Sequence, residues 1–249
     1  MRGRESVFCL LRKVRKRDAI NKVKGCYTGG MTKHYQTIFF DWNKTLSNSL
    51  FWEQLGNPEH ERHSWDADIS RYLFEENRHL VSEWMKGVID ARGIVEKISL
   101  CYGYSADILS EDLAESCRNM EFVSEEVLPL IQELRRNGVR CVIATDNMDM
   151  FARYTVPALK LIEYFDDILV SFDKGLLKFD VKNDAIPFFD GYLMENNLSY
   201  KDVVLIDDRI DTSGTYEKQG FDILQVFGPD DFVGKLKQLA GGATGIGIG

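Results

Sequence analysis

Residues 37–46 read TIFFDWNKTL. The stretch from 34 to 41 is apolar and rich in β-forming residues, and it ends on an aspartate at position 41. An unbroken apolar run of this kind is typical of a strand that is buried on both faces of a parallel sheet. We therefore predict a strand over 34–41, with Asp41 at its carboxyl end.

Beyond residue 122 the pattern alternates between apolar runs of strand length and segments with helical spacing. This rhythm predicts an α/β fold, a doubly wound parallel sheet with right-handed crossovers. Ligands bind at the carboxyl ends of the strands in such sheets. The predicted strands cover 139–144, 168–171, 203–206 and 223–227, and the predicted helices cover 129–138, 148–161, 184–197, 212–219 and 230–239.

Residues 50–122 differ from the rest of the chain. They are rich in Glu, Arg, Leu, Trp and Tyr, and their apolar residues recur at helical spacing, with Ser64 and Ser110 as candidate N-caps. We predict a helical insertion over 50–122, which divides a core domain made of 34–49 and 123–239.

The ends of the chain differ in charge and composition. Residues 1–33 hold ten Lys or Arg against two acidic residues, whereas the whole chain has a net charge of −8. We predict a basic, poorly ordered extension over 1–33 and a flexible glycine-rich tail over 240–249. The acidic body argues against nucleic-acid binding, because like charges repel.

Two further features concern the environment of the chain. No apolar run approaches the roughly 18–20 residues that a membrane-spanning helix needs, so we expect no membrane span. The five cysteines show no CxxC spacing, which is typical of reduced thiols in a cytoplasmic protein. The sequence leaves the oligomeric state open.

Chemically capable side chains follow the predicted strands. Asp41 follows the first, Thr145-Asp146-Asn147 the second, Lys178 lies in the loop after the third, and Asp207-Asp208 follow the fourth. Each alone has an ordinary explanation, such as a helix cap or a solvated lysine. Adjacent aspartates, however, cost free energy unless a cation neutralises them. Since all four groups belong to one edge of the sheet, we expect them to form a site.

These four stretches, in this order, resemble the motifs of the haloacid dehalogenase superfamily of hydrolases. The resemblance covers residues 35–239, and the helical insertion resembles the helical cap of that family. The matched motifs are Asp-x-Asp-x-Thr at Asp41 to Thr45, the Ser or Thr at Thr145, the lysine of GLLK at Lys178, and the acidic pair of VVLIDD at Asp207 and Asp208.

The resemblance implies a site for phosphoryl transfer. Asp41 would be a nucleophile that forms an aspartyl-phosphate, and Lys178 would act as a fixed positive charge. Mg²⁺ would be held by the carboxylates of Asp41, Asp207 and Asp208 and by the backbone carbonyl of Asn43, with Asp211 as an alternative to Asp207. The substrate-binding residues would be Thr45, Thr145, Asp146, Asn147 and Lys178.

Two positions depart from the family pattern. Asn43 stands where family phosphatases have the aspartate that protonates the leaving alcohol, a contribution worth about 10²–10⁴-fold in rate. An amide cannot ionise, so we expect good leaving groups, a replacement donor, or slow turnover. Lys44 stands where the family often has glycine.

We therefore expect a Mg²⁺-dependent phosphatase of small phosphorylated metabolites. Two alternatives stay open. Carbon–halogen hydrolysis uses the same aspartate without a metal, and the pair Asp207-Asp208 argues against it. The other alternative is a catalytically weak relative that binds a phosphorylated ligand. Loss of activity on chelation would separate the two enzymes.

Overall fold

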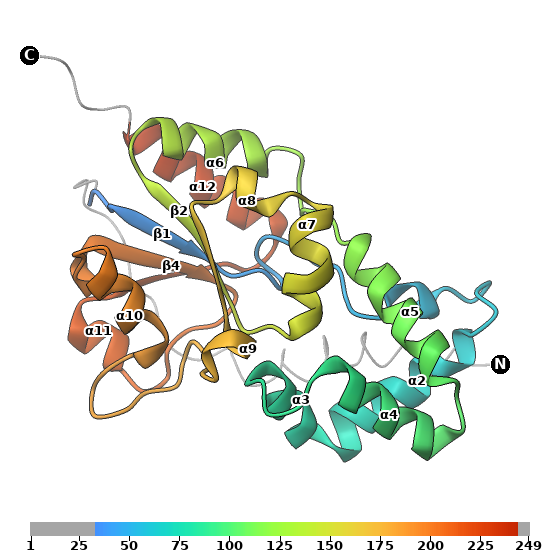
Figure 1. Cartoon of the computed structure of the whole chain (residues 1–249). Coiled ribbons are helices and arrows are strands. Elements are labelled where there is room, and N and C mark those ends of the chain that lie inside the picture. The colour runs from blue at the N-terminus through green and yellow to red at the C-terminus, as the bar shows by residue number, and fades with distance from the viewer. Residues whose placement is uncertain (1–32, 244–249) are drawn as a thin grey trace, which may run out of the picture.

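A five-stranded, all-parallel sheet forms the centre of the structure, a computed structural model that describes residues 33–243 (Figure 1). Its strand order is β3-β2-β1-β4-β5, so the α/β doubly wound prediction is confirmed. The order reverses beside β1, where such sheets place their ligands. The strands are β1 (Thr37–Phe40), β2 (Arg140–Thr145), β3 (Asp167–Val170), β4 (Val203–Asp207) and β5 (Asp222–Gln225).

Helices cover both faces of this sheet (Figure 1). Because side chains alternate along a strand, Ile38 and Phe40 pack into one apolar cluster and Phe39 into the other. The Phe39 ring lies 4.8 Å from that of Phe189. The first face is covered by α6 (Val127–Arg136) and α12 (Pro229–Ala243), and the second by α10 (Pro187–Glu195) and α11 (Thr215–Gln219).

The segment between β1 and α6 is helical. Its caps differ from the prediction: Ser64 lies within α2 and Ser110 within α5, whereas Asp90 and Ser105 accept hydrogen bonds from the first-turn amides of α4 and α5. α2 and α5 each begin before the serine that is predicted to cap them. Both serines therefore lie within a helix. The elements are η1 (Glu53–Gly56), α2 (His63–Arg71), η2 (Tyr72–Glu76), α3 (Arg78–Met85), α4 (Ala91–Tyr102) and α5 (Ala106–Arg118).

The helix predicted over 148–161 is broken. Pro157 lacks the amide hydrogen that a continuous helix needs, and Lys160 has a left-handed backbone with φ of 51°. The chain there forms η3 (Phe151–Thr155), α7 (Val156–Ala158) and α8 (Leu161–Tyr164). The remaining short elements are α9 (Ser171–Lys174) and η4 (Tyr200–Asp202).

The ends of the described chain bear on two predictions. The final helix runs four residues past its predicted end at 239, to Ala243, so the predicted tail begins inside it. Residues 1–32 and 244–249 lie outside the described residues, and with them most of the predicted extension and tail.

Polar contacts join the inserted helices to the sheet body. The Asp149 carboxylate accepts hydrogen bonds from Trp84 Nε1 at 2.7 Å and from the Ala91 amide at 3.2 Å. Lys86, after α3, pairs with Asp180 at 2.7 Å. The insertion therefore packs directly against the segments that follow β2 and β3.

Gly87 makes a close backbone approach in this junction. Its φ is +67°, and a Cβ there would lie 2.6 Å from the Phe172 carbonyl oxygen. We expect Gly87→Ala to lower the free energy of unfolding by about 2–5 kcal/mol, combining backbone strain with steric overlap. Gly103→Ala is the matched control, since Gly103 has a similar φ of +73° but open space around it, and it should cost only about 1–2 kcal/mol. If chemical denaturation gave the two variants equal losses in the free energy of unfolding, close packing at Gly87 would be contradicted.

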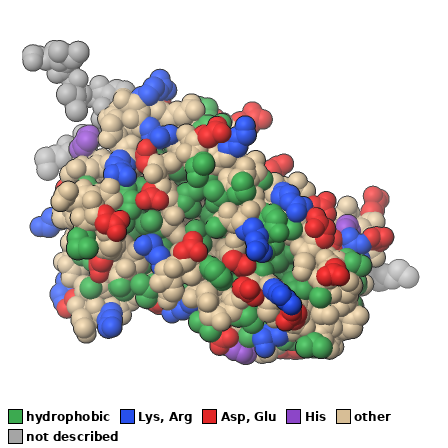
Figure 2. Space-filling view, in the orientation of Figure 1, with side chains coloured by type: hydrophobic (Ala, Val, Ile, Leu, Met, Phe, Trp, Pro, Cys, Tyr) green, Lys and Arg blue, Asp and Glu red, His purple; other side chains and the backbone are tan. Residues whose placement is uncertain are grey.

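Among the described residues, no helix is both long and apolar enough to cross a bilayer. On the face shown in Figure 2, basic and acidic side chains are interspersed over both the sheet body and the helical insertion.

Candidate active site

Three adjacent strands deliver their last residues to one edge of the sheet. In the parallel register Phe40 pairs with Ile143 of β2 and with Ile206 of β4. Asp41 therefore follows β1 beside the ends of its neighbours, which are Thr145 and Asp207. The predicted convergence of these strand ends is observed.

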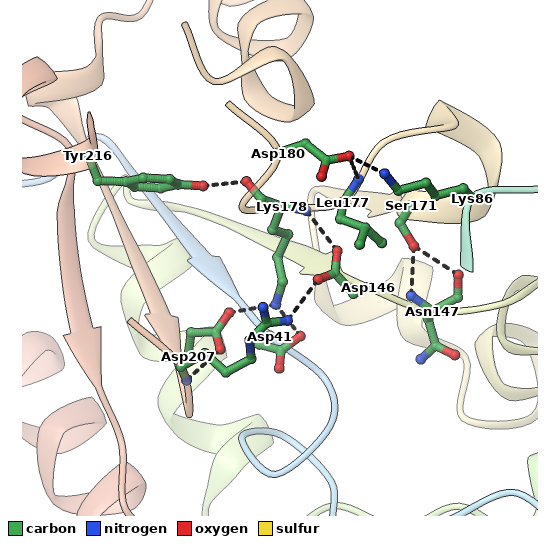
Figure 3. Close-up of polar contacts among 11 residues, drawn as sticks. Asp41, Lys86, Asp146, Asn147, Ser171, Leu177, Lys178, Asp180, Asp207 and Tyr216 are labelled. Carbon is green, nitrogen blue, oxygen red and sulfur yellow. Dashed lines mark hydrogen bonds and ion pairs between the residues drawn. The ribbon is translucent and has the colours of Figure 1, made fainter. Parts of the chain in front are cut away.

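Lys178 lies at the centre of this edge, as Figure 3 shows. Its ammonium nitrogen is 2.5 Å from Asp41 Oδ1 and 2.6 Å from Asp207 Oδ2. The side chain is only 1% exposed, so these ion pairs are shielded from water. Lys178 therefore presents a fixed positive charge between two buried carboxylates.

The backbone of Lys178 is held from two sides. Its amide donates a hydrogen bond to Asp146 Oδ1 at 2.8 Å, and its carbonyl accepts one from the Tyr216 hydroxyl at 2.5 Å (Figure 3). Asp146 Oδ2 also lies 3.2 Å from the Arg209 guanidinium. These contacts hold the Lys178 loop in place. The Asp146 carboxylate therefore has a positioning role, because it binds the Lys178 amide.

Burial dominates the electrostatics of the site. It raises the pKa of Asp41 to about 8, against the lowering effect of Lys178. Burial also raises the pKa of Asp146 and of Asp208, the latter helped by the charge of Asp207. Burial alone would lower the pKa of Lys178, but Asp41 and Asp207 raise it above the usual lysine value. The lysine therefore stays charged, and the carboxylates favour a further cation.

The acidic residues fit a divalent cation. Asp41, Asp207 and Asp208 each offer one carboxylate oxygen, and these atoms lie within 4.8 Å of one another. Asp41 and Asp207 share the one buried ammonium of Lys178, so negative charge is in excess there, and oxygen donors are the ligands that Mg²⁺ prefers. Both carboxylate oxygens of Asp207 are engaged, by Lys178 and by the Arg209 amide at 2.8 Å, whereas Lys178 engages only Oδ1 of Asp41. Asp41 Oδ2 and the half-buried Asp208 are therefore the freer ligands.

Asp211 lies outside this acidic cluster. Its carboxylate accepts hydrogen bonds from the amides of Ser213 and Tyr216 at 2.8 and 3.0 Å. It thereby holds the turn that leads into α11. The Asp211 carboxylate is therefore engaged by this turn, whereas Asp207 belongs to the acidic cluster.

Two buried threonine hydroxyls in the site lack a hydrogen-bond partner among the described residues. They belong to Thr45 and Thr145, both 0% exposed. Leaving a hydroxyl unsatisfied costs roughly 1–3 kcal/mol, so such atoms suggest a missing ligand. Asn147, by contrast, is occupied: its amide and carbonyl both bond the Ser171 hydroxyl, and its Oδ1 accepts the Met148 amide at 2.9 Å.

The turn after Asp41 carries both departures from the family pattern. Lys44 has a left-handed backbone with φ of 63°, a conformation that favours glycine. Its ammonium lies 3.9 Å from Asp208 Oδ2. Asn43 is exposed on this turn and faces the adjoining cavity.

That cavity has a volume of about 620 Å³ and connects the site to the inserted helices. Sequence reasoning missed its walls, because they depend on how the insertion packs against the sheet body. Site residues at its floor are Asn43, Lys44, Asp146, Asn147 and Asp208, and the inserted segment contributes Phe51, Trp52, Asp66, Ile69, Ser70, Leu73, Phe74, Val81, Trp84, Met85 and Met120.

Comparison with known families decides the assignment. A family model of haloacid dehalogenase-like hydrolases matches residues 38–190. The chain belongs to this family. A comparison with curated proteins found no significant match to this hydrolase.

Solved structures share the fold of this hydrolase. A predicted HAD-like family hydrolase from Porphyromonas gingivalis aligns with a TM-score of 0.58 at 15% identity, covering 82% of this chain and 97% of that one. A HAD family enzyme from Bacteroides thetaiotaomicron, in complex with magnesium and inorganic phosphate, aligns at 0.55 and 14%, covering 78% and 94%. An L-2-haloacid dehalogenase from Xanthobacter autotrophicus, with chloropropionic acid covalently bound, aligns at 0.53 and 12%, covering 77% of each chain.

Proposed function

We propose that this hydrolase is a Mg²⁺-dependent phosphatase of small phosphorylated molecules, with Asp41 as its nucleophile. The observation that carries the proposal is the meeting of Asp41, Lys178 and the acidic pair at one sheet edge. The Bacteroides neighbour with magnesium and phosphate adds support. The alternatives are carbon–halogen hydrolysis and phospholigand binding with little turnover.

The chemistry begins at Asp41. Its carboxylate would attack phosphorus, and the bond between phosphorus and the leaving oxygen would break, with that oxygen taking a proton from solvent. Water would then attack the aspartyl-phosphate, release phosphate, and regenerate the carboxylate. Bound Mg²⁺ would supply charge neutralisation for these steps. Asp41, Asp207, Asp208 and the Asn43 carbonyl are the residues that would hold it.

Other residues would bind the phosphoryl group. The unpartnered hydroxyls of Thr45 and Thr145 supply donors without breaking existing hydrogen bonds. The ammonium of Lys178 lies beside Asp41. It would neutralise the negative charge of the phosphoryl oxygens. We assign Asn147 to this group through its side-chain Nδ2, since its hydrogen bonds use its backbone and Oδ1. Asp146 positions the Lys178 amide, which it contacts directly. The inserted helices would serve as the cap that shields the reaction from water.

The purified full chain provides the direct test. We expect it to release phosphate from a panel of aryl, acyl and alkyl phosphates in MgCl₂, and to lose this activity in EDTA. Absence of release from every compound would contradict the proposal. Halide release from 2-chloropropionate that persists in EDTA would instead favour carbon–halogen hydrolysis.

Asn43 predicts a dependence on the leaving group. Because an amide cannot donate a proton to a departing alkoxide, aryl and acyl phosphates should be cleaved faster than alkyl phosphates by about 10²-fold or more. Asn43→Asp should raise alkyl-phosphate turnover and narrow that gap, as measured by kcat on matched aryl and alkyl esters. An unchanged ratio of aryl to alkyl turnover in Asn43→Asp would show that Asn43 does not set the dependence on the leaving group.

We also propose a cytoplasmic location. The three cysteines in the described part of the chain are free thiols. Burial raises the pKa of Cys117 and of Cys141 to about 12, which keeps both protonated and unreactive. Such thiols suit a reducing compartment.

Nucleic acid is not among the expected partners of this acidic body.

A further inference from the structure

The cavity beyond the phosphate site is lined by apolar side chains. Aromatic rings of Phe51, Trp52 and Trp84 contribute to its wall. Among the lining residues Lys44 is the cation, and it lies at the floor, 3.9 Å from Asp208. A volume of about 620 Å³ suits a small organic molecule. The cavity therefore fits an apolar body and offers no second anion site.

The cavity wall is largely apolar, with Asn48 and Ser49 beside the site, and α2 adds two buried polar groups to it. In α2, Asp66 and Ser70 line the cavity together with Ile69, and Leu73 of η2 follows them, at the spacing of one helix face. Asp66 is 8% exposed and Ser70 1% exposed. Both polar side chains are thus more than nine-tenths buried on the cavity side of α2.

Neither side chain has found a partner within the described residues. The Ser70 hydroxyl makes no hydrogen bond there, and no hydrogen bond or ion pair is formed by the Asp66 carboxylate. The nearby Arg62 is engaged by both carboxylate oxygens of Asp112 at 2.8 Å. Burial raises the pKa of Asp66, and the neighbouring His63 opposes this rise. His63 Nδ1 lies 2.8 Å from the Leu55 carbonyl. Within residues 33–243, Asp66 therefore has no lysine or arginine paired with it.

A ligand can supply the partner that the described residues do not give Asp66 and Ser70. A buried carboxylate without a partner is costly, because the protein interior does not replace its hydration. An ammonium carries a positive charge and three donors, enough to serve Asp66 and the Ser70 oxygen together. A neutral alcohol would satisfy hydrogen bonds but leave the charge uncompensated.

We propose that Asp66 and Ser70 bind an ammonium group of the substrate. Resting on the phosphatase function proposed above, this makes the substrate a phosphomonoester with an apolar body that carries a primary amine at the end opposite to the phosphate. The phosphate enters at Asp41, the body fills the aromatic cavity, and the amine meets α2.

A series of substituted phenyl phosphates tests the proposal. The para position carries an aminoalkyl, hydroxyalkyl or plain alkyl arm of one to four carbons. For the arm that fits, kcat/KM of the amine should exceed that of the equal-length alcohol and alkane by roughly tenfold to hundredfold, as expected for a hydrogen bond to a charged group. Equal kcat/KM values at every length in the wild-type chain would overturn the proposal.

Substitutions in α2 test which side chains give the preference for the amine. Asp66→Asn keeps the size of the side chain and should bring the amine-to-alkane ratio close to one. Asp68→Asn is the matched control on the same helix, since Asp68 pairs with Arg71 and Tyr104 instead of lining the cavity, and it should keep the ratio. Ser70→Ala should lower the ratio by a smaller factor. A ratio that survives Asp66→Asn would contradict the assignment.

Binding without catalysis separates this inference from the phosphatase proposal. Trp42, Trp52 and Trp84 line the cavity, so their fluorescence should report binding of phosphate-free phenylalkylamines. Tighter binding of the amine than of its alkane analogue, lost in Asp66→Asn, would support the amine site even if no phosphate ester is cleaved. Phosphate release without any amine preference would support the phosphatase and overturn the amine site.

Discussion

Replacing Asp41 with Asn should reduce phosphate release by about 10⁴-fold or more, because the variant lacks the nucleophile on which both chemical steps depend. The fold should persist. Lys178 keeps its contact with Asp207 at 2.6 Å, and the substitution removes one charge from a cluster in which negative charge is in excess. The measurement is kcat on an aryl phosphate in saturating Mg²⁺, together with the thermal midpoint.

Asp167→Asn is the control for this variant. Asp167 is exposed at the amino end of β3, the sheet end opposite to the site. It should leave kcat within a factor of two or so, as exposed substitutions usually do. Retention of more than about 1% of wild-type turnover by Asp41→Asn would contradict the assignment of Asp41 as nucleophile.

Lys178→Met should damage both stability and catalysis. It removes the buried ammonium that separates Asp41 from Asp207, at 2.5 and 2.6 Å. Losing one member of a buried charged group typically costs about 3–5 kcal/mol, because the remaining charges are left uncompensated. Loss of a fixed charge at the reacting group should also lower kcat by about 10²–10³-fold. Denaturant unfolding and steady-state kinetics measure the two effects.

The double variant Lys178→Met/Asp207→Asn separates these two roles. It removes one buried carboxylate along with the ammonium, so the free energy of unfolding should recover in part. Turnover should not recover, because the positive charge beside Asp41 is still missing. Recovery of kcat together with stability would show that Lys178 matters to the fold alone.

The sheet and the meeting of its strand ends could be predicted from local patterns. Apolar runs mark buried strands, and parallel pairing brings their carboxyl ends to one edge whatever the intervening chain does. For that reason Asp41, Thr145 and Asp207 meet as expected, with Lys178 between two of the carboxylates. These features depend on spacing along the chain, which the sequence displays directly.

Other features depend on packing between distant segments. Nothing local to α2 marks Asp66 and Ser70 as cavity residues, since they face the site only through the packing of the insertion. The 148–161 helix breaks at Lys160, whose left-handed backbone has a φ of 51°, and no local pattern marks that residue. The bracing contacts of Asp146 and Tyr216 on Lys178 join segments more than 30 residues apart, beyond the reach of any periodicity.

The central claim is that Asp41, Lys178 and the acidic pair form one phosphoryl-transfer centre. Crystallographic analysis of the full chain with Mg²⁺ and beryllium trifluoride tests it most directly. The account predicts beryllium bonded to a carboxylate oxygen of Asp41, Mg²⁺ bound by Asp41 and Asp208, and Lys178 Nζ within about 3 Å of a fluorine or of the Asp41 carboxylate. A fluoride complex and metal ion bound away from Asp41, with the three side chains turned to other partners, would contradict it.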